Sequence, residues 1–357
     1  MNRKQFAPWL RAVMAGLLQV WASGWIAAVL LALVVPGRAA GVTQRTIVED
    51  WPGTTAPDCL TPRSARPQDQ VWLVSTRQLA DPSGKDLCNA DWEIWCYQRH
   101  HGWTASSLSA FFDAEDPHQV TAFYVHGNRI DWETSLDRGW LAYQRLVCGA
   151  AEQTPMRFVI WSWPSSQIRG PLRDLRVKAV QTDTESYYLA WFLSRVGPGV
   201  PISLLGFSYG TRVVSGALHL LGGGEIAGRI LPAGHERTRV PMRVVLLSAA
   251  MPNYWLSPGR RYDHALSQVD HLLLLYNSRD QALRFYWCLD PDSRPQALGC
   301  TGFVGPEYWN ESDRRITQLD VSCFLGKKHS ELAYFHSPHT NSAIRPFALW
   351  QAIDETW

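Results

Sequence analysis

Short apolar runs that alternate with segments of helical periodicity dominate this sequence from residue 110 onward. The runs are VTAFYVHG, RFVIWSW, ISLLGFS, MRVVLLSAA, HLLLLYN and RITQLDVSCF. Helical patterns separate them, and the clearest two span residues 132–148 and 173–195. Near-continuous apolar strands that helices connect are typical of a parallel sheet covered on both faces. The sequence therefore predicts an α/β fold, to which the earlier run VWLVSTR contributes the first strand.

The N-terminal 40 residues have a different character. Basic residues at positions 3, 4 and 11 precede an uncharged segment over residues 12–35, and small residues follow near position 40. This order is typical of an export signal, and the apolar segment also approaches the length of a membrane span. We therefore expect residues 1–40 to be a signal peptide or an N-terminal membrane anchor. The protein is then exported to the periplasm or cell envelope, or anchored to the inner membrane.

Two further parts complete the predicted organisation. Residues 41–70 are rich in Pro, Asp, Thr and Arg, which favours a linker or extended segment. Residues 71–357 contain all the apolar runs and predict one α/β domain. Because 46% of the chain is hydrophobic, it can bury one large core.

Charge and motifs exclude several function classes. The formal net charge is +2 and no block of Lys or Arg is present, so the basic footprint of a nucleic-acid-binding protein is missing. The sequence has no HExxH, Walker A or EF-hand pattern. The segment GGGEIA fits a dinucleotide-binding pattern formally, but it follows a helical segment, which indicates a helix stop. We expect no nucleic-acid partner, no metal and no cofactor.

Seven cysteines are present, and none of them forms a C-x-x-C pair, which argues against a zinc ribbon or a thioredoxin-type motif. In an exported protein, Cys88 with Cys96 and Cys288 with Cys300 are the local disulfide pairs that the spacing suggests. The alternative to disulfide pairing is that most of the cysteines serve as small buried apolar residues.

The stretch PISLLGFSYGTRVVSGALHLLGGG places Ser208 between two glycines, where an apolar strand gives way to a helical pattern. A G-x-S-x-G sequence in this context predicts a nucleophile elbow. The glycines are needed because the turn is tight and a Cβ at either position would meet neighbouring backbone. Ser208 is therefore the candidate nucleophile. The alternative is a solvated serine in a glycine-rich turn.

Ser208 needs a partner base, because a serine hydroxyl is too weakly acidic to attack a carbonyl at neutral pH. A third group has to orient that base, and Asp280 is the predicted acid because it follows the run HLLLLYN in a loop. Asp270 precedes that strand, and Asp320 lies inside the last apolar run. A solvated loop aspartate beside Arg279 is the alternative for Asp280.

Three histidines follow the last apolar run: His329, His336 and His339. His329 lies in LGKKHSE, a few residues after Phe324, on the loop from which a histidine can reach back to the serine. We predict His329 as the general base, with His336 and His339 as the alternatives. The order Ser, Asp, His is that of α/β hydrolases.

Backbone amides near Ser208 are the candidate donors of an oxyanion hole. These are the amide of Tyr209, which follows the nucleophile, and that of Asn128, which follows the HG pair at residues 126 and 127. His126 is expected to brace this loop rather than to exchange protons.

Aromatic residues near the strand ends are candidates for the wall of an apolar substrate pocket. His126 and Trp163 are predicted to line this pocket, and Trp161 and Trp132 are further candidates for the same wall. With 18 tryptophans in the chain, core packing is the alternative for each.

The segments FYVHGNRI, VIWSWPSS, LLGFSYGTRVVSGALHLL, LLYNSRDQAL and DVSCFLGKKH resemble those of uncharacterised bacterial α/β-hydrolase-fold proteins with HGN and G-x-S-x-G motifs. The likeness covers roughly residue 71 to the C-terminus. It implies the α/β-hydrolase fold, a mostly parallel central sheet with helices on both faces, but not the substrate.

The residues and the resemblance together predict a serine hydrolase. It would act through an acyl-enzyme on an ester, a thioester or a related acyl substrate, either a small molecule or lipid-like. Two alternatives remain. One is a non-catalytic binding or scaffold protein that retains the elbow, and the other is an acyltransferase that uses the same three residues.

Overall fold

The computed structural model describes residues 65–79, 82, 87–148, 150, 155–232, 242–304 and 315–353. The chain divides into two compact units, of which the larger comprises residues 58–168 and 172–357 and contains the sheet and the residues discussed below. The predicted export signal at residues 1–40 lies outside the described residues, as does most of the predicted linker. None of the helices within the described ranges is long and apolar enough to cross a membrane.

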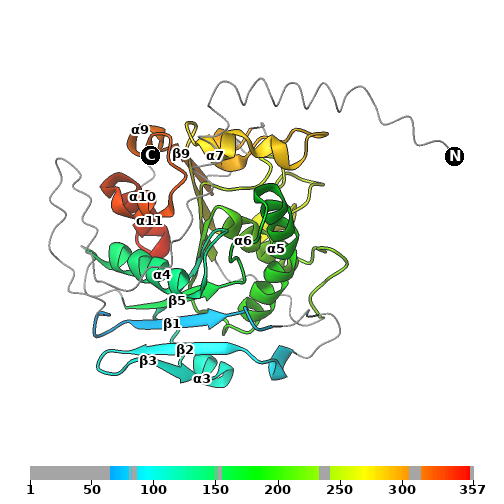
Figure 1. Ribbon diagram of the computed structural model, residues 1–357. Coiled ribbons are helices and arrows are strands. Elements are labelled where there is room, and N and C mark those ends of the chain that lie inside the picture. Colours follow the sequence, from blue (N-terminus) through cyan, green and yellow to red (C-terminus); the bar gives the residue numbers. More distant parts are fainter. Residues whose placement is uncertain are drawn as a thin grey trace, which may run out of the picture. The chain divides into compact units, whose positions relative to one another are not determined.

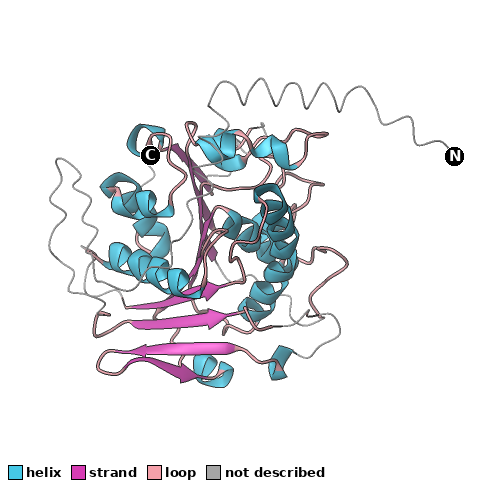
Figure 2. Cartoon of the chain, viewed as in Figure 1, coloured by secondary structure: helices cyan, strands magenta, loops and turns pink. Residues whose placement is uncertain are grey.

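Nine strands form one mixed, mostly parallel sheet in the order β3-β2-β1-β5-β4-β6-β7-β8-β9 (Figures 1 and 2). The strands are β1 (Gln70–Ser75), β2 (Glu93–Gln98), β3 (Gly102–Ser106), β4 (Val120–Val125), β5 (Met156–Ser162), β6 (Ile202–Phe207), β7 (Met242–Leu247), β8 (His271–Tyr276) and β9 (Ile316–Asp320). In the part of this order that runs β1-β5-β4-β6-β7-β8-β9, every strand is parallel to its neighbours. The α/β class predicted from the sequence is therefore confirmed.

An antiparallel edge, which the sequence analysis did not predict, extends the sheet beyond β1. β2 pairs with β1, and β3 pairs with β2, both in antiparallel register. Their residues are mostly half-buried or exposed, so these strands lack the continuous apolar run that marks a strand buried on both faces.

Helices cover both faces of the sheet (Figure 1). The helices are α3 (Leu108–Asp113), α4 (Trp132–Val147), α5 (Pro171–Ser194), α6 (Tyr209–Leu221), α7 (Gln281–Arg284), α8 (Leu298–Thr301), α9 (Ser322–Leu325), α10 (Glu331–His336) and α11 (Pro338–Ala348), with 3-10 turns η1 (Leu87–Asn89), η2 (Ala265–Gln268) and η3 (Tyr286–Leu289). One core cluster packs α5 and α6 on one face, and a second packs α4, α10 and α11 on the other. Both faces of the sheet are thus shielded from solvent, which explains the near-continuous apolar runs of the central strands.

The two longest predicted helices agree with α4 and α5 to within two residues at each end. α6 ends at Leu221 and has Gly222 as its C-cap, so the interpretation of GGG as a helix stop is confirmed.

The last strand is shorter than its apolar run. Asp320 Oδ1 accepts a hydrogen bond from the backbone N–H of Ser322 at 2.9 Å, where the chain turns into α9.

Neither of the two local disulfides that the spacing suggested is formed. Cys96, Cys288 and Cys300 carry unbonded thiols. Cys96 lies inside β2, and an extended chain rises about 3.3 Å per residue, which carries this thiol away from the preceding segment that holds Cys88. Cys148, directly after α4, is disulfide-bonded instead.

A buried acid links α5 to the end of β1. Glu185 is 2% exposed, and its Oε2 accepts a hydrogen bond from Thr76 Oγ1 at 2.6 Å. Burial raises the pKa of Glu185 from 4.5 to about 8, although the Thr76 hydroxyl and the charge of Arg77 oppose this shift. The carboxyl is therefore neutral over much of the ordinary pH range.

Replacing Glu185 by Gln should remove a pH dependence of stability. Between pH 4.5 and 8, the folded protein holds a proton on Glu185 that the unfolded chain has released. The stability that the neutral carboxyl contributes is therefore complete below pH 4.5 and is lost as the pH rises through 8. Glu185→Gln keeps an acceptor for Thr76 and carries no charge at any pH.

Thermal unfolding of both proteins at about pH 5 and about pH 9 measures this effect. We expect the stability of Glu185→Gln relative to the wild type to rise by at least about 1 kcal/mol over that interval. A difference that stays constant with pH would show that the buried carboxyl does not titrate as described.

Candidate active site

Three neighbouring parallel strands end at one edge of the sheet and place polar side chains there. Ser208 follows β6, Ser248 follows β7 and Asp280 lies in the loop after β8. These strands are adjacent in the sheet, so their carboxyl ends lie side by side, as do the sites of many α/β proteins. His329 reaches the same edge from the loop between α9 and α10.

Ser208 occupies a strained turn between β6 and α6. Its φ is 52° and its ψ is −114°, a conformation that costs a non-glycine residue about 1–3 kcal/mol and persists only where the surroundings impose it. A Cβ on Gly210 would overlap the carbonyl oxygen of Val125, and one on Gly206 would lie 2.9 Å from the carbonyl oxygen of Gly210. The close approach of β4, β6 and α6 therefore explains both glycines of the motif.

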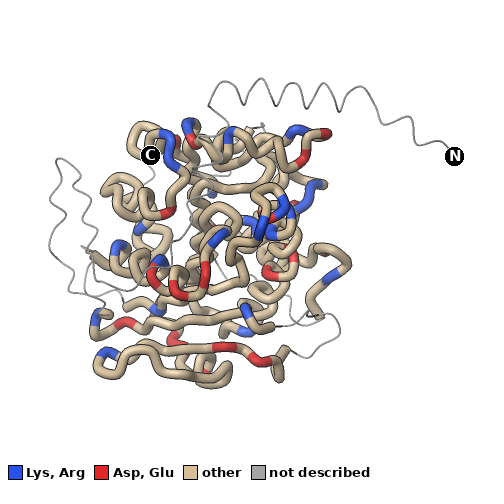
Figure 3. Tube along the Cα trace, viewed as in Figure 1, with Lys and Arg blue, Asp and Glu red and all other residues tan. Residues whose placement is uncertain are grey.

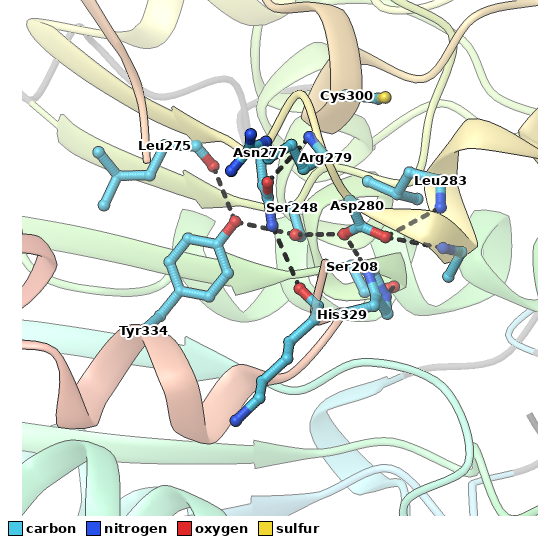
Figure 4. Close-up of polar contacts among 12 residues, drawn as sticks. Ser208, Ser248, Leu275, Asn277, Arg279, Asp280, Leu283, Cys300, His329 and Tyr334 are labelled. Atoms are coloured by element: carbon cyan, nitrogen blue, oxygen red, sulfur yellow. Dashed lines mark hydrogen bonds and ion pairs between the residues drawn. The ribbon is translucent and has the colours of Figure 1, made fainter. Parts of the chain in front are cut away.

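The side chains of Ser208, His329 and Asp280 form one hydrogen-bonded chain (Figure 4). His329 Nε2 lies 3.0 Å from Ser208 Oγ, and His329 Nδ1 lies 2.6 Å from Asp280 Oδ2. Because a carboxylate can only accept, Nδ1–H donates to Asp280, which leaves Nε2 to accept from the serine hydroxyl. The structure thus brings together the three residues that the sequence analysis selected, in the geometry of a nucleophile, a base and its orienting acid.

Asp280 is fully buried, and four donors surround its carboxylate. Oδ1 accepts from the backbone N–H groups of Ala282 and Leu283, at 2.9 and 3.0 Å, as the N-cap of α7. Oδ2 accepts from Ser248 Oγ at 3.0 Å and from His329. The carboxylate therefore has one defined position, which excludes the alternative of a solvated loop residue.

Ser248 continues the network away from the nucleophile. Its Oγ lies 2.9 Å from the hydroxyl of Tyr334 on α10, and burial raises the pKa of Tyr334, so this phenol stays protonated and can donate. Since Ser248 donates its single proton to Asp280, it accepts from Tyr334. Tyr334 thus joins α10 to the acid of the site.

Asn277 holds the loop that carries His329. This buried amide follows β8, and its Nδ2 donates to the carbonyl oxygens of Gly326 and Lys328, at 3.0 and 3.2 Å. Its Oδ1 accepts from the backbone N–H of Arg279 at 3.0 Å. One side chain therefore fixes the spacing between the loop of Asp280 and the loop of His329.

The HGN loop, residues 126–128, lies directly against Ser208. A Cβ on Gly127 would lie 3.2 Å from Ser208 Cβ, so Asn128 follows a residue that touches the serine. Asn128 Nδ2 and Arg129 Nε both donate to the buried carboxylate of Asp174 on α5, at 3.0 and 2.9 Å. Asp174 thereby fixes the backbone of the loop and with it the amide that the sequence analysis selected.

Tyr209 begins α6, where the first N–H groups have no partner within the helix. The two predicted donors, the amides of Tyr209 and Asn128, therefore belong to segments that flank Ser208.

His126 and Trp163 brace the loop from behind. Both are fully buried, and their rings stack with centroids 5.7 Å apart. His126 Nδ1 donates to the carbonyl oxygen of Gly127 at 2.9 Å, and Nε2 accepts from the backbone N–H of Trp163 at 3.3 Å. Burial lowers the pKa of His126 to about 3, so the ring is neutral. Because both side chains are completely buried, they are not placed to contact a substrate directly, contrary to the prediction that they line a pocket. Trp161 is buried likewise.

The alternative residues lie elsewhere. His336 ends α10 with its side chain near the surface, and His339 stacks on Phe324 with ring centroids 4.3 Å apart. Asp320, the last residue of β9, accepts from the backbone of Ser278 and Ser322. None of them contacts the triad of Ser208, His329 and Asp280 through a hydrogen bond among the described residues.

The sequence analysis missed Ser248, Asn277, Tyr334 and Asp174. Ser248 directly follows β7, inside the run MRVVLLSAA, and Asn277 directly follows β8, at the end of the run HLLLLYN. A full survey of polar residues at strand ends would have selected both. Tyr334 and Asp174 lie on helices, where nothing in the sequence distinguishes them from core residues.

No family model matches this sequence, and no curated protein matches it. In the described part of the chain, no group of three or more His, Cys, Asp or Glu side chains is placed to hold a metal ion.

Replacing Gly210 by Ala should destabilise the protein strongly, because the added Cβ meets backbone carbonyl oxygens of β4 and the residue after it. Gly223→Ala is a matched control: no atom lies within 4 Å of the point that its Cβ would occupy, and only its φ of +86° opposes alanine. In urea unfolding we expect the free energy of unfolding to fall by about 1 kcal/mol for Gly223→Ala and by more than about 3 kcal/mol for Gly210→Ala. Equal costs would contradict the proposed steric role of the motif.

Proposed function

We propose that this protein is a serine hydrolase of the α/β-hydrolase fold that acts through an acyl-enzyme on an ester, a thioester or a related acyl substrate. One observation carries the proposal. The hydrogen-bonded chain from Ser208 through His329 to Asp280 is complete, and its nucleophile lies in a strained turn between a parallel strand and a helix. A binding or scaffold protein has no need to maintain that strain or to orient a histidine by a buried carboxylate.

The chemistry follows from the geometry. As Ser208 Oγ forms a bond to the acyl carbon, its proton passes to His329 Nε2, which lies 3.0 Å away. Asp280 holds the ring in the required tautomer and stabilises the imidazolium. His329 then returns the proton to the leaving group as the bond to that group breaks, which leaves an acyl-enzyme. Water, deprotonated by His329, releases the acid and restores Ser208.

The negative charge that develops on the carbonyl oxygen needs donors that are already in place. We assign this role to the backbone N–H groups of Tyr209 and Asn128, which flank the serine. The hydrogen bonds from Asn128 and Arg129 to Asp174 hold one donor segment, and the start of α6 holds the other. Fixed donors cost no reorganisation during the reaction, which is why backbone amides suit this task.

A fluorophosphonate probe should label the wild-type protein, since an activated serine attacks phosphorus as it attacks a carbonyl. Ser208→Ala should abolish labelling. His329→Ala should slow labelling and ester turnover by a factor on the order of 10³ to 10⁴, because the base is lost. His336→Ala and His339→Ala are matched controls and should stay within a few-fold of the wild type.

Two results would count against the proposal, and each identifies what failed. If folded wild-type protein stays unlabelled under conditions that label a control esterase, the protein is not a serine hydrolase. If His336→Ala or His339→Ala is the inactive variant, the hydrolase survives but His329 is not its base. Circular dichroism of each variant shows whether it is folded.

We further propose that the protein functions outside the cytoplasm, exported to the cell envelope or anchored to the inner membrane by residues 1–40. The basic and then apolar order of that segment supports this, as does the disulfide bond at Cys148, since disulfides persist in oxidising compartments. Cell fractionation should find the protein in the envelope or periplasm, and mass spectrometry of its N-terminus decides between cleavage and anchoring. Recovery of the full-length chain from the cytoplasm would contradict export.

A further inference from the structure

Arg212 is a buried cation that makes no ion pair with any of the residues that the structure describes. It lies on α6, four residues after the nucleophile, and is 7% exposed. Its Nε and Nη1 are buried and have no hydrogen-bond partner, and no carboxylate pairs with it, among the residues that the structure describes. A buried N–H that finds no acceptor costs about 1–3 kcal/mol, and more where the group is charged.

Aromatic rings surround this guanidinium. Its Cζ lies 5.3 Å from the centre of the Tyr209 ring and 4.7 Å from that of Trp255. Burial lowers the pKa of Arg212, but the electrostatic effects of Tyr286, Tyr262, Tyr209 and Asp183 outweigh burial and leave the pKa raised. Cation–π contacts stabilise the charge, but ring faces do not accept the in-plane N–H groups of an arginine as an anion does.

The nearest carboxylate is already used. Asp183 on α5 accepts two hydrogen bonds from Arg261 Nη2, each of 2.8 Å, and Arg261 also lies over the Trp255 ring at 4.9 Å. Two guanidinium groups thus lie over one ring, but both of these hydrogen bonds to Asp183 come from Arg261. Among the described residues, Nε and Nη1 of Arg212 therefore keep no acceptor. Several Lys and Arg positions also lie along the tube around α5 and α6 (Figure 3).

The position of Arg212 relates this charge to the reaction. Residues four apart on a helix lie one above the other, and side chains tilt toward the N-terminus of the helix. Arg212 therefore extends back toward the turn that holds Ser208, and its guanidinium packs on Tyr209, whose amide is a proposed oxyanion donor. The charge therefore lies against the residue that directly follows Ser208.

We propose that Arg212, with Tyr209 and Trp255, forms an anion-binding subsite beside Ser208, and that the acyl substrate carries a carboxylate or another anionic group in addition to the scissile bond. This inference rests on the proposed hydrolase function for its substrate, but not for the anion site itself. The planar fork of the guanidinium suits bidentate binding of a carboxylate.

Ester turnover tests the substrate class. The probes are 4-nitrophenyl hydrogen adipate, with the anion on the acyl side, 4-butyryloxybenzoate, with the anion on the alcohol side, and the neutral methyl ester of each. We expect at least one anionic ester to exceed its methyl ester in kcat/KM by roughly 10- to 100-fold, the value of a charge-assisted hydrogen bond. No preference for either anion in the wild type would overturn the proposal.

Arg212→Met removes the charge but keeps an apolar chain among the rings. It should abolish the preference, which is measured as the ratio of kcat/KM for each anionic ester to kcat/KM for its methyl ester. Arg173→Met, the same substitution at an exposed position of α5, controls for net charge and should keep the preference. If Arg212→Met does not fold, Arg212→Lys, which retains the charge without the fork, should show an intermediate preference. An unchanged preference in either Arg212 variant would overturn the assignment.

Binding separates failure of this inference from failure of the hydrolase proposal. Calorimetry with adipate and the Ser208→Ala protein needs no turnover. We expect adipate to bind to the Ser208→Ala protein at least about 10-fold more tightly than to the Ser208→Ala/Arg212→Met protein. Equal binding overturns the subsite even if esters are cleaved, whereas a binding difference without serine reactivity retains the subsite and rejects the hydrolase.

Discussion

The buried carboxylate of Asp280 is the group on which the rest of the site depends. Its donors come from three separate parts of the chain: the end of β7 through Ser248, the start of α7 through two backbone amides, and the loop of His329. A buried carboxylate without such donors would be expensive. The same hydrogen bonds that allow its burial therefore fix the orientation of the histidine and, through it, the serine.

The sheet makes this arrangement possible by bringing distant segments to one edge. Parallel strands β6, β7 and β8 end together, so residues 208, 248 and 280 become neighbours although about 30 to 40 residues separate each one from the next along the chain. Asn277 and Tyr334 then tie the loop of His329 and helix α10 to that edge. A flexible loop would not hold a histidine within hydrogen-bond distance of two partners. The hydrogen bonds of Asn277 and Tyr334 restrict the motion of these segments and so keep His329 in place.

The other side of Ser208 is organised by a second buried carboxylate, Asp174. It holds the HGN loop, while His126 and Trp163 support that loop from within the core. Arg212, in contrast, lies on the same helix as Tyr209 without any such partner among the described residues. Two carboxylates near Ser208 thus have their donors, whereas Nε and Nη1 of Arg212 lack acceptors among the described residues, and we propose that a substrate anion supplies them.

The sequence by itself determined the central parallel strands, the turn at Ser208 and the choice of Ser208, Asp280 and His329, which the structure joins by hydrogen bonds. Apolar runs buried on both faces mark the central strands, and polar residues stand out where those runs end, so local pattern was enough for these. It did not determine the antiparallel edge of β2 and β3, whose strands are only partly buried, or the disulfide pairing, which depends on how segments approach in space. Only the tertiary structure decided the roles of Ser248, Asn277, Tyr334, Asp174 and Arg212. The physical reason is that a hydrogen bond between distant segments, or its absence, leaves no periodic pattern in the sequence and exists only once the strands are aligned.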